Sequence, residues 1–514
     1  MSAAYAVAAG QDPFKSAREQ AEVMEKHLRS SESMESTHAE LEGFVVDEGR
    51  EYQRRLLQAH LELRAERERP VVVKGADGVQ RKHRRLSSRA LMSVVGEVDV
   101  PRVAYQAPGV PGLHPMDAAL SLPDELYSHS VRRYVAESAA RSSFDEVVEG
   151  LRKSTGAAVP KRQVEELAER AAQDFDAFYS SRAVEVEDTQ ALLVLSFDGK
   201  GIAMRREDLR PATRKAADAG KHKLTKRLAK GEKRNRKRMA EVATIYTIDP
   251  WVRTPDDIVN DLRPVHDVAA QRPRPVNKRV WASVEKASRE VISAAFAEGL
   301  RRDPERLRRW VVLVDGNKDQ ITLVKRAAKK ACVEITIVLD IIHVLEYLWK
   351  AAHCFFADGT KEAEQWVTCR LHELLAGRTA GAIASTIRRH ASSRVVDMGT
   401  AVTLDTCIGY LVKHRTLLHY DRALAAGLPI ATGVIEGACR HLVKDRMDRT
   451  GARWSLRGAE AVLRLRSLRS SGDFEAYWAF HLQQEHDRTH RARYAEGDVP
   501  SPLPPPRPKL RRVK

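Results

Sequence analysis

Three acidic residues of this chain stand where regular segments would hold a carboxylate in a fixed place. Asp198 follows the apolar run ALLVLSF (191–197), and Asp315 follows WVVLV (310–314). Glu436 lies in TGVIEGACRHLVKDR (432–446), whose pattern predicts a helix. A single acid after a strand is more often a turn former or a helix cap than a metal ligand. Three of them that can meet in one fold indicate a site for hard divalent cations, which prefer carboxylate oxygens.

The segments that would position these acids alternate in a definite order. Strands are predicted at 191–198, 241–248, 279–284, 310–315 and 332–339, and helices at 285–302, 318–331 and from 341. Three successive strands followed by βα alternation predict an α/β fold, a mixed sheet with helices on both faces. This βββαβαβ order is that of an RNase H-like core. We expect Asp198 to lie where its strand gives way to a glycine-flanked turn.

The acids also suggest how the chain is divided. The predicted core comprises 186–340 and, with Glu436 and the C-terminal helices, 431–490, separated by a mainly helical insertion at 341–430. Residues 1–69 predict a helical region, and 70–125 a small β region with a hairpin about Gly96-Glu97 and an irregular connector from 106. The Pro-rich, basic end, 491–514, predicts disorder.

Residues 126–185 contain signals for a helix-turn-helix within three predicted helices. Ser143 and Glu146 form a capping-box pattern, and Gly156 marks the end of that helix. The next helix follows Pro160, and in a helix-turn-helix it would enter the DNA major groove. Its leading residues, Lys161, Arg162 and Gln163, are the candidate base contacts. An ordinary αα-hairpin remains the alternative.

The charge of the chain indicates a polyanionic partner. Its 87 Lys and Arg against 70 Asp and Glu give a net charge of +17. No apolar stretch approaches the roughly 18–20 residues of a membrane helix, and the N-terminus has no secretory pattern. We therefore expect a DNA-binding protein of the cytoplasm, at the bacterial nucleoid, without a membrane partner. The five widely spaced cysteines predict free thiols, mostly buried, and no structural zinc.

Two basic segments are candidate contacts to the DNA backbone. Residues 221–238 carry ten Lys or Arg against one acid, and a solvated charged face is the alternative for such a run. Four and eight residues after Glu436 stand two more cations, on the same helix face. An amphipathic surface helix would show the same spacing. The candidate residues are Lys233, Arg234, Arg236, Lys237, Arg238, Arg440 and Lys444.

Four segments resemble insertion-sequence transposases with a DDE triad, of the ISKra-type family and, more distantly, the Mutator type. They are LSFDGKGIAM (195–204), VVLVDGN (311–317), IVLDIIHVLEYLW (337–349) and TGVIEGACRHLVKDRMDRTGARWS (432–455). The resemblance implies that Asp198, Asp315 and Glu436 are the catalytic, metal-binding triad. It also implies that Asp340 and His343, spaced as D-x-x-H, support the site.

The same resemblance implies a function. A transposase of this kind binds the terminal inverted repeats of its own insertion sequence and target DNA, as a homo-oligomer on double-stranded DNA. Two Mg²⁺ ions, which Mn²⁺ can replace, would serve strand cleavage and strand transfer. A non-catalytic helix-turn-helix DNA-binding protein and an RNase H-like DNA nuclease are the alternatives. Asp340 also follows an apolar strand, but Asp315 is preferred for the triad because its strand should lie beside that of Asp198.

Overall fold

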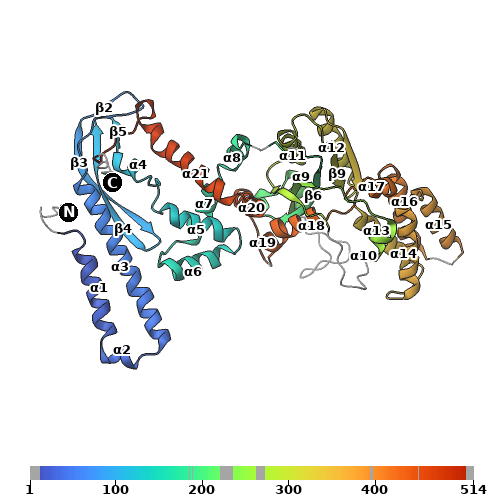
Figure 1. Cartoon of the computed structure of the whole chain (residues 1–514), viewed down its shortest axis with the longest axis horizontal. Coiled ribbons are helices and arrows are strands. Elements are labelled where there is room, and N and C mark those ends of the chain that lie inside the picture. The colour runs from blue at the N-terminus through green and yellow to red at the C-terminus, as the bar shows by residue number, and fades with distance from the viewer. Residues whose placement is uncertain are drawn as a thin grey trace, which may run out of the picture. The chain divides into compact units, whose positions relative to one another are not determined.

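The structure, a computed structural model, divides the chain into two units (Figure 1). It describes residues 12–183, 186–187, 189–219, 236–261, 272–393, 397–449 and 451–504. Unit 1 comprises Met1–Ser180 and Glu475–Lys514, and unit 2 comprises Ser181–Phe474. Over the described ranges, no helix has the length and apolar character needed to cross a membrane.

Unit 2 is built on a five-stranded mixed sheet, which confirms the α/β prediction. Its strands are β6 (Leu192–Ala203), β7 (Lys237–Ile248), β8 (Val276–Ser283), β9 (Trp310–Val314) and β10 (Ile335–Leu339). Their order in the sheet is β10-β9-β6-β7-β8. β6, β9 and β10 run parallel, whereas β7 is antiparallel to both β6 and β8. The apolar runs form central strands of the sheet: β9 and residues 192–197 of β6 are buried along their whole length. Strands covered on both faces are expected to be apolar throughout.

Helices connect the parallel strands and fill the interval before Glu436. α11 (Ser288–Arg302) precedes β9, and α12 (Lys318–Ala331) joins β9 to β10. Between β10 and the short α18 (Gly433–Ala438), which carries Glu436, the regular elements of the described residues are all helical. The helices between β10 and α18 are α13 (Ile341–Ala352), α14 (Lys361–Leu375), α15 (Ala380–Ser392), α16 (Met398–Lys413) and α17 (Tyr420–Ala425).

The prediction that Asp198 lies at the end of its strand is wrong. β6 continues past Asp198 to Ala203, paired with β7 as far as Lys237. The pairing of β6 with β9 ends at Ser196, however. Beyond Asp198, β6 therefore continues without β9 in an antiparallel β6–β7 hairpin, to which β8 stays paired only as far as Glu241, opposite Gly199. The glycines after it, Gly199 and Gly201, lie in this hairpin and form no turn.

Unit 1 begins with antiparallel helices beside a β region. α1 (Lys15–Leu28), α2 (Ser31–Glu35) and α3 (His38–Glu66) precede the short pair β1 (Val73–Lys74) and β2 (Gln80–Arg81). β3 (His83–Ser93), β4 (Gly96–Ala107) and β5 (Val110–Leu113) form an antiparallel sheet. The turn between β3 and β4 is Val94-Val95, earlier than predicted, because Ser93 already pairs with Gly96. The predicted irregular connector instead contains β5 and α4 (Pro115–Ala119).

Four helices follow where three were predicted: α5 (His129–Ala139), α6 (Phe144–Thr155), α7 (Lys161–Ala171) and α8 (Phe175–Ser181). The Ser143 side chain accepts from the Glu146 amide at 3.2 Å, and the Glu146 carboxylate accepts from the Ser143 amide at 2.8 Å. Gly156 ends α6 in the left-handed region with φ of 72°. The local capping signals therefore set α6 and the turn before α7 as expected.

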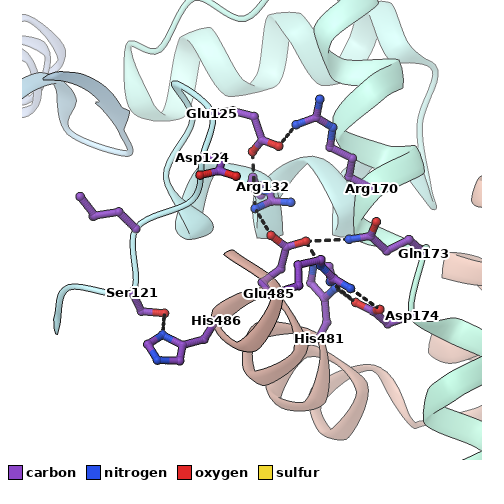
Figure 2. Close-up of polar contacts among 12 residues, drawn as sticks. Ser121, Asp124, Glu125, Arg132, Arg170, Gln173, Asp174, His481, Glu485 and His486 are labelled. Carbon is purple, nitrogen blue, oxygen red and sulfur yellow. Dashed lines mark hydrogen bonds and ion pairs between the residues drawn. The ribbon is translucent and has the colours of Figure 1, made fainter. Parts of the chain in front are cut away.

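The last long helix, α21 (Phe474–Thr489), supplies unit 1 with a set of buried polar contacts that the sequence did not predict (Figure 2). The fully buried Arg132 of α5 lies 3.4 Å from Glu485 and 3.6 Å from Glu125. Asp174 pairs with His481 at 2.6 Å and with Arg488 at 2.7 Å. Buried charges are costly unless they are paired, so α21 is required to neutralise those of α5 and of the segment before α8.

Unit 1 should lose stability in mild acid. Burial lowers the pKa of His490 from 6.5 to about 4, against a hydrogen bond to the Leu122 carbonyl. Burial, with nearby arginines, likewise lowers the pKa values of His114 and His129 to about 4. The unfolded chain therefore takes up protons first as the pH falls. The stability contributed by these neutral histidines is complete above pH 6.5 and is lost as the pH falls toward 4.

For His490 the expected loss of unfolding free energy is on the order of 2–3 kcal/mol across that interval. Proteolysis at sites within unit 1, followed from pH 7 to pH 5, is the measurement. His490→Gln can keep a donor to the Leu122 carbonyl but does not titrate, so its susceptibility should change less with pH. An identical pH profile for His490→Gln and the unaltered chain would rule out His490 as a source of the effect.

Candidate active site

Three aspartates lie at one end of the sheet of unit 2. Asp198 is in β6, and Asp315 and Asp340 directly follow β9 and β10. The last pair between β6 and β9 is Ser196 with Leu313, two residues before Asp198 and two residues before Asp315. Leu339 of β10 pairs with Val314, and the Asp340 amide donates to the Val314 carbonyl at 2.8 Å. The ends of parallel strands meet at the same edge. The structure therefore brings Asp198 and Asp315 onto neighbouring strands and places Asp340 beside Asp315.

Asp198 is held between a cation and a thiol. Its Oδ2 lies 3.1 Å from the Lys200 ammonium and accepts from the Cys439 thiol, also at 3.1 Å. Burial raises the pKa of Cys439, and the Asp198 charge raises it further, so the thiol keeps its proton and donates. Burial opposes the charge of Lys200, but the carboxylate of Asp198 raises the pKa of this lysine. Sequence reasoning missed both partners, although Lys200 stands two residues after Asp198.

The segment that carries Glu436 makes hydrogen bonds to two of the aspartates, one before Glu436 and one after it. The Thr432 amide donates to Asp340 Oδ1 at 3.1 Å, and the Thr432 hydroxyl donates to Glu436 Oε1 at 3.4 Å. Cys439, three residues after Glu436, contacts Asp198. Glu436 therefore lies between an anchor at Asp340 and an anchor at Asp198, and its side chain is exposed.

Beyond Glu436 the helix widens into a π-helical turn, Cys439–Lys444. Such turns are rare and are frequent at functional sites. The alternative of a plain amphipathic surface helix does not account for this turn. Arg440 and Lys444 are exposed, as is Glu436, and Arg440 lies 3.7 Å from Asp445. Both cations are therefore exposed on the same segment as the carboxylate, although the π-helical turn changes the spacing on which the predicted shared helix face depended.

Asp340 is a fully buried carboxylate whose oxygens are all engaged. Oδ1 accepts from the Thr432 and Ile342 amides at 3.1 and 3.3 Å, and Oδ2 lies 2.7 Å from His343 Nδ1. Burial raises the pKa of Asp340, but the hydrogen bonds from His343 and Thr432 outweigh it, and the net shift is downward. The bond to Asp340 raises the pKa of His343. These contacts hold the Asp340 carboxylate against the segment that carries Glu436 and against His343.

The turn after Asp315 is packed against α16 of the helical segment. Gly316 has φ of 98°, and a Cβ there would come within 3.1 Å of the Tyr410 hydroxyl. Tyr410 donates to the Asp315 carbonyl at 3.0 Å, and its ring stacks on Tyr347 with centroids 3.9 Å apart. Only glycine satisfies both the backbone angle and the close approach. The helical segment thus supports the backbone of a candidate catalytic residue.

A fourth carboxylate, Glu241 of β7, was missed by sequence reasoning. It pairs across the hairpin with Gly199, the neighbour of Asp198, and is only 8% exposed. Gln320 of α12 donates to it at 3.0 Å. Burial raises the pKa of Glu241, and the charges of Asp198 and Asp315 raise it further against its hydrogen bonds. In the sequence, Glu241 is visible only as an acid at the start of the apolar run EVATIYTI. Its position at the site depends on the register of β7 against β6, which pairs Glu241 with Gly199.

The donor set fits a hard divalent cation in its chemistry. The site contains four carboxylates, those of Asp198, Glu241, Asp315 and Glu436. Lys200 forms an ion pair with one of them, Asp198. Their oxygens do not converge in this conformation: in the part of the chain that the structure describes, no group of three His, Cys, Asp or Glu side chains could hold a metal ion. The exposed Glu436 side chain would have to turn toward Asp198 to complete such a group.

No protein-family model matches this chain, and no curated protein is similar to it. The fold and the site geometry therefore carry the functional argument together with the sequence motifs.

The other candidate DNA contacts lie in both units. In unit 1, Lys161 and Arg162 are exposed at the start of α7, but Lys161 pairs with Asp145 at 2.7 Å and Arg162 with Glu166 at 3.1 Å. Gln163 is half-buried and also donates to Glu166. These exposed ion pairs contribute little free energy and can open for a phosphate.

In unit 2, β7 begins with Lys237 and Arg238, and Arg236 directly precedes it. Lys233, Arg234 and the rest of the basic run before them lie outside the described residues. Lys237 pairs with Asp448 at 3.3 Å, and Arg238 donates to the Val284 carbonyl at 2.8 Å. Arg238 is thus partly a structural residue of the hairpin. Arg236 and Lys237 are exposed on the hairpin that extends from Asp198.

The cysteines are free, as predicted, but they are not mostly buried. Cys407 and Cys439 are buried, Cys354 is half-buried, and Cys332 and Cys369 are exposed. Cys332 is exposed because it ends α12 in the left-handed region, where the chain turns toward β10.

Proposed function

We propose that this chain is a metal-dependent DNA transposase of the DDE type with an RNase H-like core. The observation that carries the proposal is the sheet order β10-β9-β6-β7-β8, in which the strands that lead to Asp198 and Asp315 are neighbours, while contacts to Asp340 and Asp198 flank Glu436. Antiparallel β6–β7–β8 followed by parallel β9 and β10 is the arrangement expected of that core. The motifs that resemble ISKra-type and Mutator-type transposases supply the reaction class.

In the proposed reaction, Asp198, Asp315 and Glu436 would hold two Mg²⁺ ions, for which Mn²⁺ could substitute. When bound, such ions activate the attacking oxygen and neutralise charge on the phosphate during in-line displacement. Lys200, Arg440 and Lys444 contribute positive charge for the DNA backbone beside the acids. Water is the attacking group in strand cleavage, and the freed 3′-hydroxyl attacks target DNA in strand transfer.

The helices α6 and α7 are proposed to bind the terminal inverted repeats, with the chain acting as a homo-oligomer on double-stranded DNA. A purely DNA-binding protein has no use for carboxylates beside a phosphate path, because they repel it. The four acids at one sheet edge therefore favour an enzyme over a non-catalytic helix-turn-helix protein. The helices between β10 and α18 favour a transposase over a smaller nuclease of the same fold.

The test uses duplex DNA from the two ends of the genetic element that carries this gene. Strand cleavage at the element ends is expected in Mg²⁺ and in Mn²⁺, binding without cleavage in Ca²⁺, and no cleavage after chelation with EDTA. Because the proposed reaction depends on metal to activate water, metal removal should abolish it. Cleavage that persists in EDTA would exclude the proposed metal dependence. Equal binding to element ends and unrelated DNA, with no cleavage in either metal, would exclude a transposase.

A further inference from the structure

Unit 2 has a cavity of about 420 Å³ beyond the end of β6. We call it the arginine cavity, because Arg205, Arg206, Arg236 and Arg453 line it. It begins at Met204, six residues after Asp198 along the strand direction, which corresponds to roughly 20 Å at the rise of an extended chain. It is therefore separate from the acids but lies on the same β6–β7 hairpin.

The rim of the arginine cavity is held together by backbone hydrogen bonds. The Met204 amide donates to the Arg236 carbonyl at 3.0 Å, and the Arg205 amide donates to the Trp454 carbonyl at 2.8 Å. The Trp454 amide donates in turn to the Ala203 carbonyl at 3.0 Å. Trp454 is buried, with the Arg446 guanidinium 4.6 Å from its ring centroid, so it packs as a support. Three separate chain segments are thereby fixed around one space.

The charge of the lining is unbalanced, because four arginines stand against two carboxylates, those of Glu207 and Asp218. Arg206 pairs with Asp218 at 2.8 Å. Arg205, Arg236 and Arg453 are exposed, and none of the carboxylates in the described ranges pairs with them. The net positive charge of the lining attracts an anion into this space. Guanidinium is also the side chain best matched to the oxygens of a phosphate.

The floor of the arginine cavity is apolar. Met204 and Leu209 are 2% and 5% exposed, and Ala217 of α9 (Pro211–Ala219) completes the apolar lining. The volume falls in the range of roughly 300–1,000 Å³ that is usual for small-molecule sites. A ligand with a phosphate on one side and an apolar ring on the other matches both parts of the lining. A nucleotide unit has this character.

We propose that the arginine cavity binds one nucleotide unit of an unpaired DNA strand, with phosphates on Arg205, Arg236 and Arg453 and the base against the apolar floor. The bases of a duplex are stacked inside it, so a concave cavity can receive a base only from an unpaired strand. The inference rests on the proposed function in that the strand is the DNA cut at the acids. The β6–β7 hairpin would then lead that strand from the arginine cavity past Lys200 to Asp198.

Binding of a single strand without divalent metal tests this proposal. The probe is fluorescein-labelled oligothymidylate of about 12 nucleotides, measured by fluorescence anisotropy at several salt concentrations. Removal of one cation that binds a phosphate should reduce the slope of log K against log salt concentration by about 0.7 for a single strand. The double variant Arg205→Gln/Arg453→Gln should therefore lower the slope by about 1.4 and weaken binding most at low salt.

The matched control is Arg326→Gln/Lys329→Gln on α12, which removes two exposed positive charges elsewhere in unit 2. It should leave the slope as in the unaltered chain. Equal slopes for all three proteins, or an equal reduction in the control, would overturn the proposal. All substituted side chains are exposed, and unchanged circular dichroism confirms that the variants are folded.

Two further arms identify the source of the phosphate. With duplex DNA of the same length the cavity variant should retain its slope, and an equal reduction there would overturn the assignment to an unpaired strand. Thymidine 5′-monophosphate should compete only weakly, and binding as tight as that of the oligonucleotide would assign the cavity to a free nucleotide instead. Because no metal is present, a chain that binds as expected but never cleaves DNA would remove the proposed function and leave this inference standing.

Discussion

Asp198→Asn should reduce strand cleavage by about 10³-fold or more, since the charge stabilisation that bound metal supplies is worth several kcal/mol. The substitution keeps the shape of the side chain and removes the charge that would hold the cation. Asp198 is 22% exposed on its side chain and its ion pair with Lys200 is partly solvated, so the fold should be retained. Asp315→Asn and Glu436→Gln should have effects of the same size.

The measurement is cleavage of element-end DNA in Mg²⁺, with DNA binding measured in Ca²⁺. Asp319→Asn is the matched control, because Asp319 is an exposed acid in the first turn of α12, four residues after Asp315. It should cleave at the rate of the unaltered chain, and all the variants should bind DNA. A triad variant that cleaves normally would lose its place among the metal-binding residues.

Asp340→Ala should uncouple the Glu436 helix from the sheet. The change removes a fully buried carboxylate and leaves the Thr432 amide, the Ile342 amide and His343 without their acceptor. Breaking a buried charged group of this kind costs about 3–5 kcal/mol. Hydrogen exchange in peptides that contain Thr432 and α18 should accelerate by roughly 10²–10⁴-fold, the equivalent of that loss in local stability.

Asp340→Asn serves as the comparison for this effect. Its amide oxygen can still accept from the Thr432 amide, so exchange in α18 should change much less. Cleavage should fall steeply in Asp340→Ala and be retained at least in part in Asp340→Asn, because the backbone anchor of Glu436 survives. Unaltered exchange in α18 of Asp340→Ala would show that the carboxylate does not position this helix.

The elements of unit 2 were predictable because their signals are local. Apolar runs ending in Asp198 and Asp315 become central strands, and the alternation with helices fixes their order. The capping box of Ser143 and Glu146 and the glycine at 156 likewise act within a few residues of themselves. Asp198 and Asp315 could be predicted to lie close together because their strands, β6 and β9, are parallel neighbours in the sheet.

What could not be predicted depends on pairings between distant segments. Glu241 reaches the site through its register opposite Gly199, and the length of β6 past Asp198 depends on the same ladder. Cys439 meets Asp198 although 241 positions separate them. In unit 1, Arg132 contacts Glu485, which is 353 residues away in the sequence. No local sequence pattern indicates that either residue is buried. In a single sequence, the residues that make such contacts appear only as isolated polar residues, so the contacts could not be predicted.

The return of α21 to unit 1 has a consequence for synthesis of the protein. Unit 1 is discontinuous, so the ribosome must finish all of unit 2 before α21 emerges. At about 5–20 residues per second that interval lasts on the order of tens of seconds. During it, Arg132 and Asp174 have no partner from α21. A nascent chain therefore completes unit 2, with its acids in place, before it completes the helices proposed to recognise element ends.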